Sequence, residues 1–304
     1  MSKVTESSFR MGIDLGGTKT EVLVLDPAGE PVYRRRVDTP AHGYTQILAM
    51  VGELVADAEH ETGHAVSVGI GIPGAISAVS GRLRNSNTLC LNGSAFDRDL
   101  ETALGRPVRI ENDANCFALS EALGGAARGH AVVFGVIVGT GTGGGIVVDG
   151  RLLRGAHAIG GEWGHNPLPW RRAEDGEPAC YCGKTACIET FLSGPGMARN
   201  YAARHGRAMT SREIVAAAAS GEPSCVQMLD LYHDQMARAL AHLINILDPG
   251  AVVLGGGMSN IESIYLELPR RLPEYVFSDF VATPILRAEH GDASGVYGAA
   301  MLWE

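Results

Sequence analysis

Three cysteines and one histidine have the spacing of a metal site. Cys180, Cys182 and Cys187 fall in one short segment, and His165 lies upstream of them in Glu162-Trp-Gly-His165. Three thiolates and an imidazole form a closed tetrahedral ligand set for Zn²⁺, with no position left for a reacting water. The pattern predicts a structural zinc held by His165, Cys180, Cys182 and Cys187. Three unrelated buried thiols are the alternative.

Two aspartates stand where a parallel sheet would present reactive groups. Asp113 follows the apolar run 108–110 and precedes a helical segment, and Asp14 ends the first apolar strand. Carboxyl ends of parallel strands are the usual place for ligands in α/β folds. Asp113 is therefore a candidate catalytic carboxylate, and Asp14 a candidate for holding Mg²⁺ through water. Equally simple roles are a helix N-cap for Asp113 and a turn cap for Asp14.

Three glycine-rich loops could hold phosphate. They are Gly16-Gly-Thr-Lys19, Gly139–Gly145 and Gly255–Gly257. Glycine allows backbone N–H groups to converge on an anion, and a lysine or threonine adds a charge or a further donor. Tight hairpin turns alone would explain one such loop easily and three poorly. The loops therefore favour a polyphosphate ligand.

A duplicated hairpin positions these residues. The segment 11–26 superimposes without a gap on 134–149, with an offset of 123, and each reads as strand, Gly/Thr turn, strand. Chance similarity of two glycine-rich hairpins is the alternative. We predict two related α/β units, joined by a helix near 115–125.

Hydrophobic periodicity predicts the surrounding elements. Apolar residues recur at helical spacing over 45–61 and 228–247, and Thr210-Ser-Arg-Glu213 has the spacing of a capping box before a short helix. The run 251–254 reads as a buried strand that leads into the third glycine loop. Together these segments indicate an α/β protein.

Composition excludes several classes of protein. Hydrophobic residues make up 45% of the 304 residues, enough for a globular core, and the net charge of −9 argues against a nucleic-acid partner. The longest apolar run, 132–138, is far shorter than the ~20 residues of a membrane span. The polar N-terminus shows no secretory signal, and the clustered cysteines fit a reducing compartment. We expect a cytoplasmic protein without a membrane partner.

The motifs together resemble the ROK family (repressors, open reading frames and sugar kinases), and within it the bacterial fructokinase/mannokinase type. The resemblance runs from Gly12 to about Trp303. The matching motifs are Asp14-Leu-Gly-Gly-Thr-Lys19, Gly71-Ile-Pro-Gly74, Glu111-Asn-Asp-Ala-Asn115, Gly139-Thr-Gly-Thr-Gly-Gly144, Glu162-Trp-Gly-His165, the zinc segment from Cys180 to Glu189, and Gly255-Gly-Gly257.

The resemblance implies an actin/hexokinase-like α/β fold of two RNase H-like domains, with ATP and a sugar in the cleft between them. The first domain would span 1–120 and be completed by a C-terminal helix within 290–304. The second would span 121–289 and carry the zinc. Relatives are commonly dimers, so a homodimer is expected.

The resemblance also assigns roles to residues. Asp113 would be the general base, and His165 would bind zinc and sugar through opposite ring nitrogens. Asp14 would hold a water of the magnesium ion. The residues expected to bind the sugar are Gly74, Asn87, Asn112, Asp113, Glu162, His165 and Glu189. Those expected around the nucleotide phosphates are Asp14, Gly16, Gly17, Thr18, Lys19, Gly139, Thr140, Gly141, Thr142, Gly143, Gly144, Gly255, Gly256 and Gly257.

The implied reaction is in-line transfer of the γ-phosphoryl group of ATP to a sugar hydroxyl, with Asp113 taking the proton. One departure from the family pattern is Ala186, which stands where glycine is usual and asks for a less unusual backbone angle. We expect fructose as the substrate, converted to fructose 6-phosphate, with mannose or glucose as further substrates.

Three alternatives to fructokinase remain. N-acetylglucosamine kinases share every catalytic motif and are the nearest alternative. A sugar-sensing repressor of the family would carry a helix-turn-helix domain, and only eleven residues precede Gly12. The third is a catalytically dead binding protein, which the intact Asp14 and Asp113 argue against.

Overall fold

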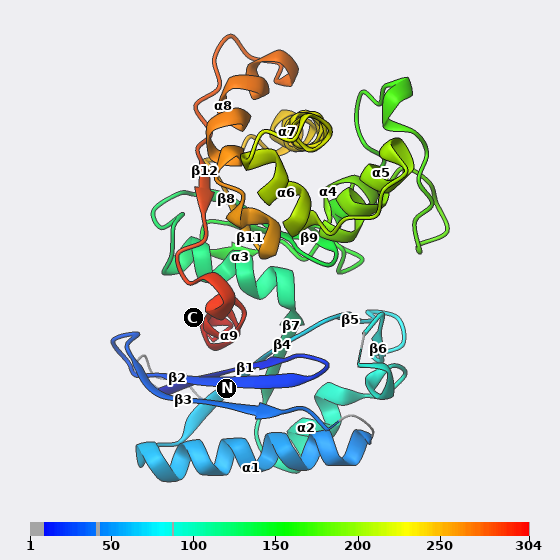
Figure 1. Cartoon of the computed structure of the whole chain (residues 1–304). Coiled ribbons are helices and arrows are strands. Elements are labelled where there is room, and N and C mark those ends of the chain that lie inside the picture. Colours follow the sequence, from blue (N-terminus) through cyan, green and yellow to red (C-terminus); the bar gives the residue numbers. More distant parts are fainter. Residues whose placement is uncertain (1–8, 41–42, 87, 304) are drawn as a thin grey trace.

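The chain forms two five-stranded sheets with helices between and around them (Figure 1). The computed structural model describes residues 9–40, 43–86 and 88–303. Both sheets mix parallel and antiparallel strands, as the α/β prediction requires.

The first sheet has the strand order β3-β2-β1-β4-β7. Strands β1, β4 and β7 run parallel, β2 is antiparallel to β1, and β3 is antiparallel to β2. The strands are β1 (Phe9–Leu15), β2 (Lys19–Leu25), β3 (Pro31–Asp38), β4 (Val66–Ile72) and β7 (Val108–Asn112). Two short strands, β5 (Ala75–Ile76) and β6 (Leu83–Arg84), pair with each other beyond the end of β4.

The register of this sheet brings the predicted acidic residues to one edge. Asp14 on β1 pairs with Gly71 on β4, and Gly71 pairs with Glu111 on β7. Because the three strands are parallel, their carboxyl ends lie side by side. The segments around Asp14 and Asp113 therefore meet although they are far apart in the sequence.

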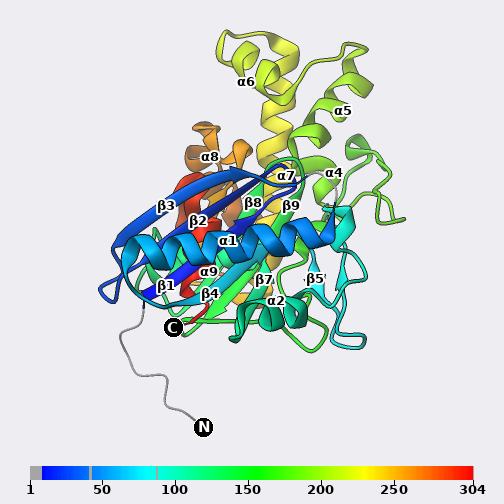
Figure 2. The ribbon, with the colours of Figure 1, turned by 90° about the horizontal axis from the view of Figure 1, so that it is seen from below.

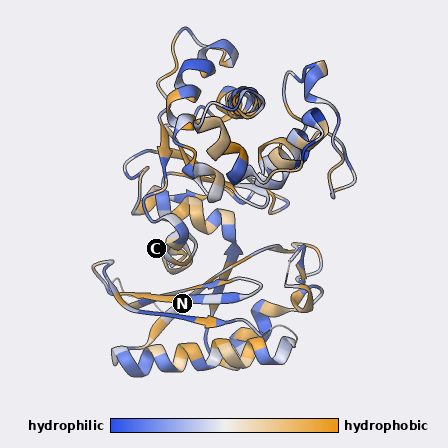
Figure 3. Cartoon of the chain, in the orientation of Figure 1, coloured by the Kyte–Doolittle hydropathy of each residue, from blue (hydrophilic) through white to orange (hydrophobic). Residues whose placement is uncertain are grey.

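Helices α1 (Tyr44–Thr62) and α2 (Phe96–Leu104) lie on one face of the first sheet (Figures 1 and 2). The prediction of a helix over 45–61 is confirmed. One side of α1 is buried, with Ile47, Val51 and Leu54 in the core. Hydrophilic and hydrophobic stretches accordingly alternate along α1 in Figure 3.

The second sheet repeats this pattern, with the order β10-β9-β8-β11-β12. Its strands are β8 (Val132–Val138), β9 (Thr142–Val148), β10 (Arg151–Leu152), β11 (Ala251–Gly255) and β12 (Ile285–Arg287). β8 pairs antiparallel with β9 and parallel with β11, as β1 pairs with β2 and β4. The predicted duplication of the hairpin is confirmed.

The two hairpins differ by one residue in register. Gly12 pairs with Leu23, whereas its counterpart Gly135 pairs with Gly145. The first turn therefore joins Leu15 to Thr20 across four residues, and the second joins Val138 to Thr142 across three. The gapless sequence match hides this shift, because pairing register is set by the turn and by packing on each face.

Helices α3 (Asp113–Leu123) and α9 (Ser294–Met301) pack against each other between the two sheets (Figure 1). α3 lies on β8 and β9, and α9 lies on β1 and β4. At Gly298 the helices approach so closely that a Cβ atom would lie 1.7 Å from the carbonyl oxygen of Cys116. Buried Glu121 on α3 accepts hydrogen bonds from the backbone N–H of Glu289 and the hydroxyl of Ser294.

The remaining helices cover the far side of the second sheet (Figure 1). They are α4 (Glu189–Leu192), α5 (Gly194–His205), α6 (Ser211–Ala219), α7 (Pro223–Leu247) and α8 (Ser263–Tyr275). The predicted capping box of Thr210 and Glu213 begins α6. The predicted helix over 228–247 forms the C-terminal part of α7, and the strand over 251–254 is β11. Among the described residues, no helix is both long and apolar enough to cross a membrane.

Candidate active site

Asp113 is the first residue of α3 and directly follows strand β7 of the first sheet. The backbone N–H of Ala114 donates to Oδ1 of Asp113 at 2.8 Å and to Oδ1 of the N-cap residue Asn112 at 2.9 Å. Burial raises the pKa of Asp113, the Ala114 N–H opposes that rise, and the charge of Glu162 adds to it. A carboxylate with a raised pKa is a better proton acceptor than an ordinary aspartate.

Asn112 joins this helix start to the loop after β4. Its Nδ2 donates to the carbonyl oxygen of Gly74 at 3.2 Å. Gly74 has a φ of 104°, and a Cβ atom there would lie 2.5 Å from the carbonyl oxygen of Arg84. The loop conformation at Gly74 thus requires glycine, and the predicted sugar residues Gly74 and Asn112 are in contact.

Glu111 also fixes this corner of the sheet. Its Oε1 accepts from the backbone N–H of Asn112 and from Nδ2 of Asn115, each at 3.0 Å. Its Oε2 forms an ion pair with Arg154, which follows β10 of the second sheet. This ion pair crosses from one sheet to the other. The sequence carried no signal for Arg154, because pairing over 43 positions depends on the tertiary fold.

Asp14 lies beside this group at the end of β1. Burial and the charges of Asp113 and Glu21 raise its pKa to about 6, against a smaller opposing effect of Arg36. Gly295 at the start of α9 packs against the carboxylate, so a Cβ atom there would lie 3.1 Å from Oδ2. Buried carboxylate oxygens are the hard ligands that suit Mg²⁺ and its waters.

The first glycine loop, Gly16–Lys19, is tied to β3. The ammonium of Lys19 forms an ion pair with Asp38, and both side chains are largely exposed. The carbonyl oxygens of Gly16 and Thr18 accept from the hydroxyl and the backbone N–H of Thr39. The ammonium of Lys19 is therefore paired with the carboxylate of Asp38 in this structure. A role of Lys19 in binding phosphate stays a prediction.

The second glycine loop forms the turn between β8 and β9. The backbone N–H of Gly139 donates to the carbonyl oxygen of Gly141, and Oε2 of Glu189 accepts from the N–H of Thr142 at 2.9 Å. Glu189 thus contacts the turn itself. The hydroxyl of Thr142 is buried and has no hydrogen-bond partner within the described part of the chain. It is a donor available to a ligand.

The second and third glycine loops border one cavity of about 660 Å³. Gly139 and Thr140 line one side, and Gly257 and Met258 of the short 3₁₀-helix η4 (Gly257–Asn260) line another. Ser211 and Arg212 at the start of α6 complete it. No described residue of the first glycine loop, Gly16–Lys19, lines this cavity. The volume suits a nucleotide-sized ligand. Sequence patterns gave no reason to place Ser211 and Arg212 here.

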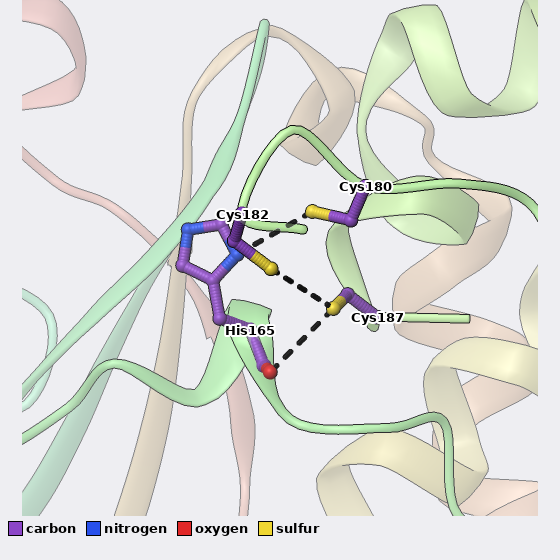
Figure 4. Close-up of side chains that lie close together, drawn as sticks. All are labelled: His165, Cys180, Cys182 and Cys187. Atoms are coloured by element: carbon purple, nitrogen blue, oxygen red, sulfur yellow. Dashed lines mark hydrogen bonds between the residues drawn. The ribbon is translucent and has the colours of Figure 1, made fainter. Parts of the chain in front are cut away.

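The predicted metal ligands meet in one cluster (Figure 4). The four ligand atoms of His165, Cys180, Cys182 and Cys187 lie within 4.8 Å of one another. Nδ1 of His165 is 3.6 Å from Sγ of Cys180, and the Sγ atoms of Cys182 and Cys187 are 3.6 Å apart. Tetrahedral zinc with ~2.3 Å Zn–S bonds separates its ligands by ~3.5–3.8 Å, so the donor set fits Zn²⁺.

The other ring nitrogen of His165 faces Tyr181. Nε2 lies 3.0 Å from the Tyr181 hydroxyl, and the two rings meet edge to face at 5.1 Å. The side chain of Tyr181 is largely exposed, but partial desolvation of its hydroxyl and the charges of Glu189 and Glu162 raise its pKa to about 12. Glu162 therefore acts on both Asp113 and Tyr181. No pattern in the sequence marked Tyr181 as a site residue.

Two features outside the ligands shape the metal loop. Buried Arg238 on α7 makes two 2.9 Å hydrogen bonds to Asp175 and one of 3.1 Å to the carbonyl oxygen of Trp170, which anchors the segment between His165 and Cys180. Ala186 has a φ of 54°. The expectation of a less unusual angle there is wrong, because the loop keeps the left-handed conformation that favours glycine and alanine adopts it with strain.

Asn87, the remaining predicted sugar residue, lies outside the described residues. Gly143 and Gly144 belong to β9 and continue from the second turn, and Gly255 and Gly256 lead from β11 into η4. The structure thus gathers Asp14, Asn112 and Asp113 at the edge of the first sheet. The second and third glycine loops and the metal cluster lie on the side of the second sheet.

Known proteins match this chain over nearly its whole length. The ROK family model matches residues 10–304. N-acetyl-D-glucosamine kinase of Yersinia pseudotuberculosis serotype O:3 (strain YPIII) is 40% identical over 296 residues, which cover 96% of this chain and 97% of that protein.

Two solved structures agree with this match. The ROK hexokinase of Thermus thermophilus matches with a TM-score of 0.87 and 34% identity, over 96% of this chain and 97% of the other. A ROK family glucokinase of Streptomyces griseus, solved with glucose and AMPPNP, matches with a TM-score of 0.75 and 28% identity, over 97% and 99%. The predicted actin/hexokinase-like fold is confirmed, and the chain belongs to the ROK family.

Proposed function

We propose that this protein transfers the γ-phosphoryl group of ATP to a hydroxyl of N-acetylglucosamine. Family membership and the named relatives make it an ATP-dependent sugar kinase, as predicted. They favour N-acetylglucosamine over fructose, because relatives 40% identical over almost the full length carry that name. The sequence-based preference for fructose is therefore given up in favour of its stated alternative.

The observation that carries the proposal is the position of Asp113. Its carboxylate has a raised pKa and is held by the first turn of α3, and its charge interacts with those of Asp14 and Glu162. A sugar hydroxyl placed against Asp113 loses its proton to Oδ as its oxygen attacks phosphorus. The hydrogen bond from Asn112 to Gly74 fixes the loop after β4 beside Asp113.

The phosphates fit the opposite side of the site. The backbone N–H groups of Thr140 and Gly141 at the tip of the second glycine loop, together with the hydroxyl of Thr142, would bind developing negative charge. The cavity between Thr140, Gly257 and Arg212 would accommodate the nucleoside. Asp14 would hold the hydrated Mg²⁺ that accompanies ATP. That cation would also offset the repulsion between Asp14 and Asp113.

A zinc ion would be held by His165, Cys180, Cys182 and Cys187. It would supply no chemistry to the transfer, because four protein ligands leave it without an open position. Its role would be to lock the loop that carries Tyr181 and to fix the orientation of the His165 ring. A homodimer and a cytoplasmic location stay predictions that accompany this proposal.

A panel of sugars tests the proposal. ATP consumption is measured with N-acetylglucosamine, glucose, mannose and fructose at equal concentrations. We expect the highest kcat/KM with N-acetylglucosamine. Glucose is the second candidate, because the Streptomyces griseus glucokinase, which is 28% identical to this chain, was solved with glucose. No turnover with any sugar would contradict the kinase function and leave a sugar-binding or regulatory role.

A further inference from the structure

Tyr181 is an exposed side chain that is nevertheless held in place. It lies between the ligands Cys180 and Cys182 and is 83% exposed. Its hydroxyl is 3.0 Å from Nε2 of His165, and the rings meet at an interplanar angle of 87°. Because so little of the ring is buried, these two contacts with His165 fix its position.

The contact occupies the one ring nitrogen of His165 that faces away from the cysteines. Nδ1 points at Sγ of Cys180 from 3.6 Å and needs its lone pair to bind a metal. With a metal on Nδ1, Nε2 carries the ring proton and donates a hydrogen bond to the hydroxyl of Tyr181. A polar N–H group beside the cluster is thus covered by an exposed phenol.

Acidic side chains also act on Tyr181. The charge of Glu162 acts on Tyr181 and on Asp113, and the charge of Glu189 acts on Tyr181. Glu189 in turn accepts from the N–H of Thr142 in the second glycine loop. Glu162 and Glu189 thus link Tyr181 by charge to Asp113 and to the second glycine loop.

We propose that Tyr181 is a gate on the sugar site: in the sugar-free protein its hydroxyl occupies Nε2 of His165, and a sugar hydroxyl takes that place on binding. This inference rests on the proposed function. The exchange replaces one hydrogen bond by another, and the released phenol is solvated because the side chain is already exposed. Tyr181 is a positioning residue that tunes sugar affinity without touching the phosphoryl group.

Tyr181→Phe tests the gate in the zinc-loaded protein. The variant keeps the ring and removes the competing hydroxyl. We expect the Kd and KM for N-acetylglucosamine to fall about three- to tenfold, with kcat and the KM for ATP unchanged. Tyr44→Phe is the matched control. The hydroxyl of Tyr44 on α1 donates a hydrogen bond to Asp99 on α2, away from the metal loop. Zinc content and melting temperature establish that both variants are folded.

Histidine ¹⁵N spectra give a second readout that is independent of turnover. Tyr181→Phe should shift the Nε2 resonance of His165 in the sugar-free protein, and saturating sugar should bring wild type and variant to the same position. Unchanged or weaker sugar binding by the variant overturns the gate, as does a difference in Nε2 that survives saturation. Wild-type protein that phosphorylates no sugar refutes the proposed function, and the gate falls with it. A working kinase whose variant binds sugar normally refutes the gate alone.

Discussion

Asp14 and Asp113 lie at the same edge of the first sheet, and the charge of Asp113 contributes to raising the pKa of Asp14 to about 6. The parallel strands β1, β4 and β7 produce this proximity, with Gly71 between the two acidic strands. Two largely buried carboxylates at one edge repel each other unless a proton or a cation is shared between them. The arrangement therefore suits a site that binds magnesium-bound phosphate.

The raised pKa of Asp14 predicts how stability changes with pH. A carboxyl that binds its proton more tightly in the folded chain destabilises that chain as pH rises from about 3.8 to about 6, and the loss persists above pH 6. Asp14→Asn should therefore be more stable than wild type at pH 7.5, by about 1–3 kcal/mol, and the gain should shrink toward pH 4. Thermal melts of both proteins without ligand measure this.

Asp279→Asn is the control for that series, because Asp279 is exposed and lies far along the chain from the acidic centre. Its difference from wild type should vary less with pH. An Asp14→Asn variant less stable than wild type at pH 7.5 would contradict the prediction that burial and repulsion from Asp113 make the charged form of Asp14 unfavourable.

Loss of the metal should affect the sugar more than ATP. Cys182→Ser removes a ligand on the exposed side of the cluster, and the loop with His165 and Tyr181 loses its anchor. We expect the KM for sugar to rise about tenfold or more and the KM for ATP to change less than about twofold. Cys90→Ser alters a thiol outside the cluster and should leave both constants unchanged. An equal rise in the KM for sugar and the KM for ATP would contradict the placement of the cluster beside the sugar site.

Ala186→Gly should stabilise the metal loop. Alanine at a φ of 54° carries ~1–2 kcal/mol of strain, and glycine costs ~0.5–1 kcal/mol more than alanine in lost chain entropy. The net expectation is a gain of about 0.5–1 kcal/mol in the free energy of unfolding, with zinc bound at least as tightly. Denaturant unfolding of the zinc-loaded proteins decides it, and a loss of stability would mean that the buried methyl group outweighs the strain.

Gly298→Ala should disrupt the packing between the two sheets. A Cβ atom there would lie 1.7 Å from the carbonyl oxygen of Cys116, so α9 must move away from α3. We expect a loss of at least about 3 kcal/mol or a failure to fold. Gly52→Ala is the matched helix substitution, because a Cβ atom at Gly52 would have no atom within 4 Å, and it should stabilise α1 by up to ~1 kcal/mol. Unfolding in denaturant measures both changes, and a Gly298→Ala variant as stable as wild type would contradict the close approach of the helices.

Local patterns predicted most of the fold and part of the site. The helix over 45–61, the capping box at Thr210 and the repeated hairpin all follow from residue types within a few positions of one another. The metal cluster was predictable for the same reason, since its three cysteines lie on one short loop. These features depend on short-range geometry that the sequence states directly.

Contacts between distant segments were not predictable. The ion pairs of Lys19 with Asp38 and of Arg154 with Glu111 depend on strand register and on how the sheets face each other. The contact of Tyr181 with His165 depends on the path of the metal loop. Such pairings are decided by packing, and no spacing in the sequence encodes them.

The central claim is that Asp113 accepts the proton of the sugar hydroxyl. Asp113→Asn keeps the shape of the side chain and can still accept the N–H of Ala114, so folding and zinc content should be unchanged. The measurement is steady-state phosphorylation of N-acetylglucosamine by wild type and variant at saturating ATP. We predict that kcat falls by about 10²–10⁴-fold while the Kd for sugar changes little. Turnover within a few fold of wild type would contradict the claim.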